Sequence, residues 1–204
     1  IQNVTDPIEI NIGSTLNSNN YLMAGQGITK NNLRKVEIGS KVNEILNNAF
    51  IDCKKLQSVT ISNSVTFIGN YAFSDCDALQ SVTIPDSVTY LGIAAFSSCS
   101  ALQSVTIGNS VPKIEGSTFQ NCKKLQSVTI PDSVETIGHA AFAYCYDLKS
   151  VTIGNSVQSI GGDAFEDCEK LQSVIIPDSV KEIQDNAFKN SGKSTLSGIS
   201  TLYM

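Results

Sequence analysis

The sequence lacks several residues on which chemistry and partner choice usually depend. It has no tryptophan, a single histidine and only 16% charged residues, with 19 acidic side chains against 14 basic ones in 204 residues. The net charge of −5 argues against nucleic acid as a partner, because that role needs a basic surface. No apolar run approaches the roughly 20 residues of a membrane-spanning helix. We therefore expect no nucleic-acid binding and no membrane insertion by this segment.

What the sequence does contain is an internal repeat of 23 residues. All six cysteines keep this spacing: Cys53, Cys76, Cys99, Cys122, Cys145 and Cys168. Seven phenylalanines keep it too: Phe50, Phe73, Phe96, Phe119, Phe142, Phe165 and Phe188. Each unit reads Leu-x-x-Val-x-Ile-x-x-Ser-Val-x-x-Ile-Gly-x-x-Ala-Phe-x-x-Cys-x-x. A fixed period of this length is typical of a solenoid built from stacked coils.

The spacing within one unit predicts its local structure. In Ser58–Ile61, polar and apolar residues alternate with the period of two expected of a strand with one buried face. Turn residues follow, after which Val65 and Ile68 return to the core. Gly69 then offers a positive φ at a corner. Residues 72–79 place apolar side chains three and four residues apart, which predicts a short helical segment on the return.

Stacking explains how such units bury their apolar residues. One coil cannot bury its inward row, whereas stacked coils give each row an identical neighbour above and below. Residues 31–190 hold seven such coils. We therefore predict an α/β solenoid with one parallel β-sheet face and short helical or irregular returns.

The repeated motifs resemble the leucine-rich repeat, whose signature is Leu-x-x-Leu-x-Leu. The 23-residue form is similar to the BspA-like class, as shown by Ile84-Pro85-Asp86-Ser87-Val88, Ile68-Gly69 and Ala72-Phe73-Ser74-Asp75-Cys76. This resemblance spans residues 31–190 and implies a right-handed solenoid. It also implies a cell-surface or secreted protein, although Ile-Gln-Asn-Val-Thr at the N-terminus lacks the features of a signal peptide. Several members of the class are associated with adhesion, and the class has no shared catalytic motif.

The two ends of the sequence depart from the repeat. Residues 1–30 are out of phase, and alternating Ile8, Ile10 and Ile12 predict a strand in an N-terminal capping segment. Ser191 takes the place of cysteine in the last unit. We interpret residues 191–204 as an incomplete C-terminal coil, with a last strand over residues 196–201.

Reactive side chains are few, and each has a structural interpretation. The cysteines form one column, and we expect buried free thiols rather than strained disulfides or a metal site. His139 and the carboxylates that flank the cysteines are expected to be solvated, whereas general-acid catalysis requires desolvation. We therefore expect no cofactor, no metal and no catalytic residue.

The outward face of the sheet carries rows of hydroxyl side chains. Candidate ligand-binding residues on it are Ser81, Thr83, Ser104, Thr106, Ser127 and Thr129. These rows can simply bond along the ladder, since threonine favours strands. Alternatively they form a flat polar binding face for a protein, a glycan or even an ice lattice.

Aromatic side chains at variable positions are the second group of candidates. Phe67 and Tyr90 occupy the same position in adjacent coils, so they should touch. Tyr144 and Tyr146 flank Cys145. Large aromatics at solvent-facing positions are candidate binding anchors, although scattered exposed aromatics are also normal.

These observations favour a non-enzymatic binding or adhesion module. Its expected partner is a protein or glycan of a host matrix or of a neighbouring cell. The alternative is a structural spacer that projects another domain and binds nothing itself. An enzyme ranks third, because no constellation of residues supports one.

Overall fold

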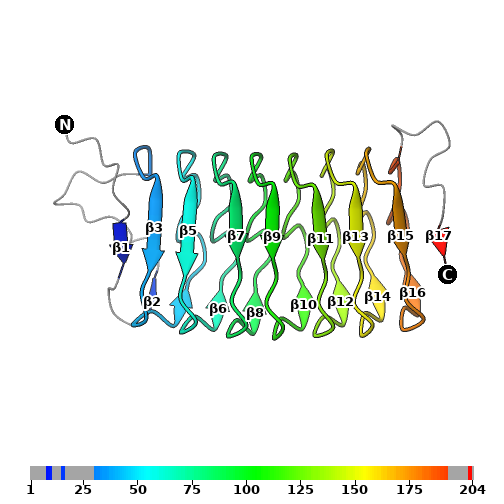
Figure 1. Ribbon diagram of the computed structural model, residues 1–204, viewed down its shortest axis with the longest axis horizontal. Coiled ribbons are helices and arrows are strands. Elements are labelled where there is room, and N and C mark those ends of the chain that lie inside the picture. The colour runs from blue at the N-terminus through cyan, green and yellow to red at the C-terminus, as the bar shows by residue number, and fades with distance from the viewer. Residues whose placement is uncertain (1–7, 11–14, 17–29, 193–201, 204) are drawn as a thin grey trace.

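Stacked coils run along one axis of the computed structural model, which describes residues 8–10, 15–16, 30–192 and 202–203 (Figure 1). Counted from their leucines, coil 1 begins at Leu33 and coil 7 at Leu171. Each coil gives one strand to a nine-stranded parallel sheet, called sheet A here. Its strands are β1 (Ile8–Ile10), β3 (Lys35–Ile38), β5 (Ser58–Ile61), β7 (Ser81–Thr83), β9 (Ser104–Thr106), β11 (Ser127–Thr129), β13 (Ser150–Thr152), β15 (Ser173–Ile175) and β17 (Leu202–Tyr203).

Identical residues face one another across sheet A. Val36 pairs with Val59, and Val128 pairs with Val151. The 23-residue period sets this register, because each coil must place its inward residues above those of the coil before it. The predicted solenoid with a parallel sheet is therefore confirmed, while its right-handed winding stays a prediction.

A second strand face, which the sequence analysis did not predict, lies across the core from sheet A. It consists of two four-stranded parallel sheets. Sheet B contains β2 (Thr15–Leu16), β4 (Glu44–Ile45), β6 (Phe67–Ile68) and β8 (Tyr90–Leu91). Sheet C contains β10 (Lys113–Ile114), β12 (Thr136–Ile137), β14 (Ser159–Ile160) and β16 (Glu182–Ile183). These strands have two residues each, too few to show the alternation by which a strand is recognised in sequence.

Pro112 explains why sheets B and C are separate. Elsewhere in this column each amide donates to the preceding coil, as the Thr89 N–H does to the Thr66 carbonyl at 2.9 Å. Proline has no N–H and cannot donate to the Thr89 carbonyl. The ladder is therefore interrupted between β8 and β10 and resumes where the Glu135 N–H donates to the Pro112 carbonyl at 2.9 Å.

The returns are successive turns, so of the two predicted forms the irregular one is present and the helical one is wrong for the residues that the structure describes. The described fold is therefore all-β, and the α part of the predicted α/β class is wrong as well. The amides of Asn48 and Phe50 donate to carbonyls of the next coil at 2.9 and 2.7 Å, whereas the Ala49 N–H between them donates to Leu46 at 3.2 Å. A helix directs its amides along its own axis, to the residue four positions earlier. Here alternate amides point along the solenoid axis instead, which joins neighbouring coils.

Two positions of every return have positive φ. The first column contains Asn48, Tyr71, Ala94, Ser117, Ala140, Asp163 and Asn186, and the second contains Asp52, Asp75, Ser98, Asn121, Tyr144, Asp167 and Asn190. Left-handed backbone is unfavourable for most residues, and Asn and Asp tolerate it best after glycine. This tolerance explains why Asn and Asp recur in both columns.

The glycine column has a different role from the one predicted. Gly69 does not have positive φ. A Cβ on Gly69 would lie 2.5 Å from the Asn47 amide nitrogen, and one on Gly138 would lie 2.8 Å from the Glu115 carbonyl carbon. Glycine is therefore needed at this corner because adjacent coils approach closely there.

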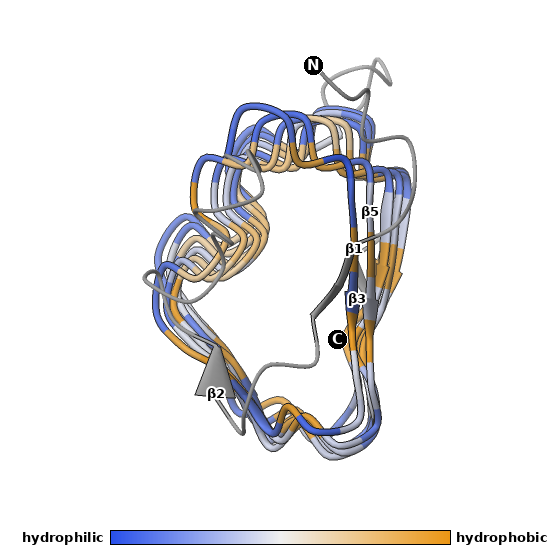
Figure 2. Ribbon diagram, turned by 90° about the vertical axis from the view of Figure 1, so that its left-hand side faces the viewer, coloured by the Kyte–Doolittle hydropathy of each residue, from blue (hydrophilic) through white to orange (hydrophobic). Residues whose placement is uncertain are grey.

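Figure 2 shows the two strand faces and the return surrounding the interior of the coils, and the buried apolar side chains of the core pack in this interior. The seven phenylalanines stack along the solenoid with ring centroids 5.0–5.7 Å apart and planes within 14° of parallel. Such aromatic pairs contribute about 0.5–1.5 kcal/mol each beyond the area they bury. Each ring except those at the two ends therefore stacks between a ring of the preceding coil and a ring of the following coil.

Strand pairing extends beyond the seven coils. Strand β1 pairs with β3, and Ile8 lies opposite Val36. At the other end β17 pairs with β15. The predicted strand over residues 196–201 and the predicted position of Ile12 lie outside the described residues. The capping role of both ends stays a prediction.

Neighbouring alanines of coil 5 test whether the return is a turn or a helix. Ala140 has positive φ and Ala141 is fully buried without it. We expect Ala140→Gly to raise the free energy of unfolding by up to about 1 kcal/mol, because it relieves left-handed strain. Ala141→Gly should lower it by about 1–2 kcal/mol through lost burial and a more flexible backbone. Urea denaturation measures both, and equal losses, as in a helix, would contradict the turn structure.

Glycines also allow a test of close approach between coils. Gly69→Ala should lower the free energy of unfolding by about 1–3 kcal/mol, because its Cβ would overlap backbone atoms of coil 1. Gly116→Ala is the control, since its Cβ would meet only the His139 carbonyl oxygen, at 3.4 Å. Thermal denaturation of both variants measures the loss of stability. A Gly69→Ala protein as stable as wild type would contradict this explanation.

Candidate functional site

The outward face of sheet A exposes the predicted hydroxyl rows. The Ser and Thr side chains of β7, β9 and β11 face solvent, while Val82 and Val128 between them are buried. The rows are in register, with Ser81 opposite Ser104 and Ser104 opposite Ser127. Alternation of buried valine with exposed hydroxyls is what a strand with one buried face requires.

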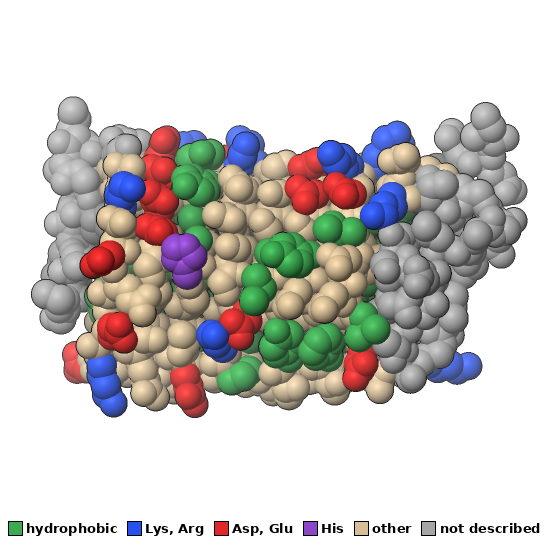
Figure 3. All heavy atoms as spheres, turned by 180° about the vertical axis from the view of Figure 1, so that it is seen from behind, with side chains coloured by type: hydrophobic (Ala, Val, Ile, Leu, Met, Phe, Trp, Pro, Cys, Tyr) green, Lys and Arg blue, Asp and Glu red, His purple; other side chains and the backbone are tan. Residues whose placement is uncertain are grey.

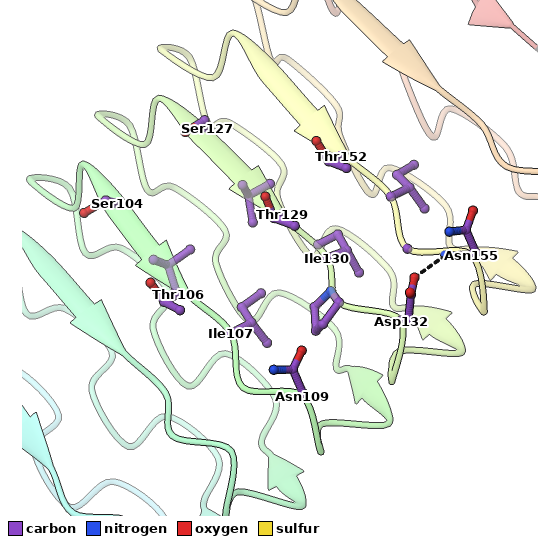
Figure 4. Close-up of a pocket in the computed structure, with 15 residues that line it drawn as sticks. Ser104, Thr106, Ile107, Asn109, Ser127, Thr129, Ile130, Asp132, Thr152 and Asn155 are labelled. Carbon is purple, nitrogen blue, oxygen red and sulfur yellow. Dashed lines mark hydrogen bonds between the residues drawn. The ribbon is translucent and has the colours of Figure 1, made fainter.

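A groove of about 540 Å³ interrupts this face over β9, β11 and β13 (Figure 4). The hydroxyl side chains that line it are Ser104, Thr106, Ser127, Thr129 and Thr152. Asn109, Asp132 and Asn155 lie beyond the ends of these strands, and Val105, Ile107 and Ile130 also contribute to the lining. Four of the six predicted sheet residues therefore meet at one groove, while Ser81 and Thr83 lie outside its lining.

The groove lies where the ladder between β9 and β11 is incomplete. These strands pair only at Ser104 and Ser127. Ile84 and Ile130 donate their amides to the following coil at 2.9 and 2.8 Å, whereas no described bond does so for Ile107 or Ile153, so the incomplete strand pairing itself distinguishes this position. Val105 is half-buried, whereas the corresponding valines of the other coils are buried.

Pro131 accounts for part of this opening. In coil 2 the residue at the same position, Ser62, donates its amide to the Ile38 carbonyl at 3.2 Å. Proline lacks this N–H donor. Strand β7, which precedes Pro85, likewise pairs with β5 at one residue only. The strands before Pro177 pair fully, so proline permits the opening without forcing it.

Aromatic and aliphatic side chains form a second surface, on the face opposite sheet A. Phe67 and Tyr90 stack with ring centroids 4.8 Å apart and planes 9° from parallel, which confirms the predicted contact. Tyr71 and Ile93 are 44% and 41% exposed. We call these four residues the aromatic patch, and Figure 3 shows apolar side chains gathered toward the N-terminal half of this face.

Asn70 connects the members of the aromatic patch. Its side-chain oxygen accepts the Tyr90 hydroxyl at 3.3 Å and the Ile93 amide at 2.9 Å. The Tyr71 amide donates to the Ile93 carbonyl at 2.9 Å. The patch is therefore held in place by the backbone of two coils. Tyr71 and Ile93 were not among the predicted site residues. Both stand at positions outside the repeated apolar columns, and this placement was the sequence signal that could have identified them.

Tyr144 and Tyr146 belong to a third surface, on the returns of coils 5–7. Their ring centroids are 6.4 Å apart, and the rings are tilted by 57°. The Tyr144 hydroxyl donates to Glu166 at 3.2 Å, and Lys189 pairs with the same carboxylate at 2.8 Å. The hydrogen bond from Lys189 lowers the pKa of Glu166, while donation to Glu166 raises the pKa of Tyr144.

Charges near the third surface are paired and solvated. His139, with a side chain 68% exposed, places Nδ1 3.8 Å from Asp163. Asp147 pairs with Lys170 at 2.6 Å and Lys124 at 3.1 Å, and the hydrogen bond from Lys170 lowers the pKa of Asp147. Such exposed pairs contribute little to stability, and the lysine partners, by lowering the pKa values of Asp147 and Glu166, favour the ionised form of both rather than the protonated form that a general acid needs.

The cysteines are fully buried, as predicted, and five of the six thiols donate a hydrogen bond to a backbone carbonyl. The Cys76 thiol donates to the Phe50 carbonyl at 3.3 Å, and the other cysteines after Cys53 repeat this bond. The Ser191 hydroxyl replaces it in the last coil, donating to the Phe165 carbonyl at 2.5 Å. Burial raises the pKa of the Cys145 thiol to about 12, so these cysteines are poor nucleophiles.

These surfaces are suited to noncovalent contact. Among the described residues no three His, Cys, Asp or Glu side chains are placed to hold a metal ion. The described part of the chain also contains no helix long and apolar enough to span a bilayer.

Comparisons with known proteins agree with this architecture. The family model for the BspA type leucine rich repeat region matches residues 28–149 and 135–201, in six copies. No curated protein matches the chain.

Solved structures of bacterial leucine-rich repeat proteins are similar to the chain. One from Eubacterium ventriosum has 29% identity and a TM-score of 0.73, covering 76% of this chain and 42% of that one. Another, from Bacteroides ovatus, has 31% identity and a TM-score of 0.68, covering 74% and 39%. A leucine rich repeat protein from T. pallidum has 25% identity and a TM-score of 0.53, covering 78% of this chain and 71% of that one. The chain thus spans about two fifths of the first two relatives.

Thiol reactivity tests the buried cysteine column. We expect no reaction with an aromatic disulfide reagent at pH 8 in the native protein, because the thiols are buried and protonated. In denaturant without reductant, all six should react. Fewer than six reactive thiols would reveal disulfides, and rapid reaction of the native protein would show that the column is accessible.

Proposed function

The chain belongs to the BspA-type leucine-rich repeat family, and we propose that it is a non-enzymatic adhesion module of a cell-surface or secreted protein. Leucine-rich repeat proteins are generally non-enzymatic, and the described surfaces offer hydrogen bonds and apolar contacts. The proposed partner is a protein of a host matrix or of a neighbouring cell. The family and the exposed surfaces support this proposal.

The aromatic patch is the observation that carries the proposal. Binding energy at protein interfaces is concentrated in a few anchors, most often aromatic residues and arginine. Phe67 and Tyr90 brace each other, and Asn70 fixes the neighbouring backbone, so little conformational entropy is lost when a partner covers them. The hydroxyl rows of β7, β9 and β11 contain no aromatic or arginine side chain.

The groove on sheet A supports a role for glycan as the second proposed partner. Its hydroxyl, amide and carboxylate groups can hydrogen-bond to sugar hydroxyls, and its apolar lining can contact the less polar ring faces. The alternative function is a structural spacer that projects another domain. Its support is the regularity of the stack itself, which gives a straight scaffold without needing any ligand.

A double substitution separates the adhesion module from the spacer. Phe67→Ser/Tyr90→Ser should weaken binding to the recognised matrix protein or cell surface about tenfold or more, because it removes both rings. Thr136→Ser/Ser159→Ala changes the same column in coils 5 and 6 and is the matched control. Binding to immobilised matrix proteins and to cells is the measurement, with circular dichroism to verify folding. Equal binding by wild type, the double variant and the control to every surface tried would favour the spacer.

A further inference from the structure

The corners that follow the strands of sheet A alternate between two types in coils 3–7, whereas coils 1 and 2 carry Gly39-Ser40 and Ser62-Asn63. Coils 3, 5 and 7 carry Pro-Asp, at Pro85-Asp86, Pro131-Asp132 and Pro177-Asp178. Coils 4 and 6 carry Gly-Asn, at Gly108-Asn109 and Gly154-Asn155. Coils 3–7 therefore have a period of two coils at this corner, superimposed on the period of one coil elsewhere.

A Gly-Asn corner closes over the Pro-Asp corner before it. The Asp86 carboxylate accepts the Asn109 amide at 2.7 Å, and Asp132 accepts the Asn155 amide at 2.7 Å. A Cβ on Gly154 would lie 2.6 Å from the Pro131 carbonyl oxygen, so only glycine fits against the proline. The proline beneath is buried in both pairs. In this contact the Pro-Asp corner supplies the carboxylate acceptor, and we call it the receiving half. The Gly-Asn corner supplies the amide donor, and we call it the closing half.

Coil 7 presents a receiving half with no closing half among the described residues. Pro177 is only half-buried, and Asp178, which receives no described amide, is exposed. A hollow of about 430 Å³ lies here, lined by Ile176, Pro177, Asp178, Val180 and Ile183 among others. Ile183 is 37% exposed and Val180 is partly exposed, although the corresponding residues of the earlier coils are buried.

A buried hydroxyl without a partner marks the same corner. Ser87 and Ser133, in the two Pro-Asp coils that have a follower, donate to carbonyls of the preceding coil at 2.6 and 2.9 Å. Ser179 stands at the same position, yet its Oγ is buried without a hydrogen-bond partner, alone among described side-chain polar atoms. Because the acceptors of Ser87 and Ser133 belong to the preceding coil, the unpaired Ser179 hydroxyl shows that this corner is positioned differently from the two corners that have a follower, and it costs stability until the corner shifts.

The register of β17 shows where the missing half would lie. Leu202 pairs with Val174, and Tyr203 pairs with Ile175, in the parallel sense of the other strands. A coil in this register places its corner and second strand over Pro177–Ile183. We propose that this end of the solenoid is a stacking surface for a further coil of the same polypeptide, and that this coil carries a Gly-Asn corner. The Asp178 carboxylate receives its amide, and its apolar column covers Val180 and Ile183.

Two extended proteins test this inference. One extends the full chain after Met204 with a copy of residues 154–170, which begins with Gly-Asn, and the other with a copy of residues 131–147, which begins with Pro-Asp. The Gly-Asn extension should raise Tm by several degrees more than the Pro-Asp extension. Asp178→Ala should reduce that difference, because the corner loses its acceptor.

Two results would overturn the inference. Equal Tm values for the two extended proteins would show that the corner does not select its follower. A dimer of the unextended chain that Ile183→Asp converts to monomers would show that a second copy occupies this surface instead. Sedimentation velocity of the wild-type chain and of Ile183→Asp distinguishes that case. The adhesion assay above depends on other residues, so its failure would leave this test unaffected.

Discussion

Each coil of this protein lies against a near copy of itself, and this 23-residue register determines the rest of the structure. It places valine opposite valine in sheet A and stacks the phenylalanine rings in the core. It also directs alternate amides of the return to the next coil. None of these contacts exists within a single coil, because the side-chain contacts need a matching side chain in the next coil and the amide bonds need its backbone at the same height. The stack, and not the coil, is therefore the stable unit.

Departures from the repeat create the features that distinguish one part of the surface from another. Pro112 separates the two sheets of the second face, and the incomplete β9–β11 ladder opens the groove beside Pro131. Phe67 and Tyr90 replace small or polar residues of the same column and form the aromatic patch. Individual binding properties can thus be added at variable positions while the columns preserve the fold.

The buried columns could be predicted from the sequence because the positions that repeat every 23 residues are also the positions that carry apolar side chains. The Phe67–Tyr90 contact followed from the same register. The form of the return could not be predicted, since apolar residues three and four apart suit both a helix and a series of turns, and only the partners of the amides distinguish them. The groove was also beyond prediction, because it depends on a missing ladder bond. Tyr71 and Ile93 became site residues only when Asn70 was seen to connect them to Tyr90.

Deletion of two whole coils tests the register most directly. Removal of residues 85–130 joins Ile84 to Pro131 and keeps every column aligned, including the alternation of corners. We expect this shortened protein to unfold in one cooperative transition at a lower temperature than wild type, with β-sheet circular dichroism retained. Removal of residues 85–128 instead shifts every later residue by two positions, and this protein should lose the transition. Similar cooperative unfolding of both deletion proteins would contradict the account.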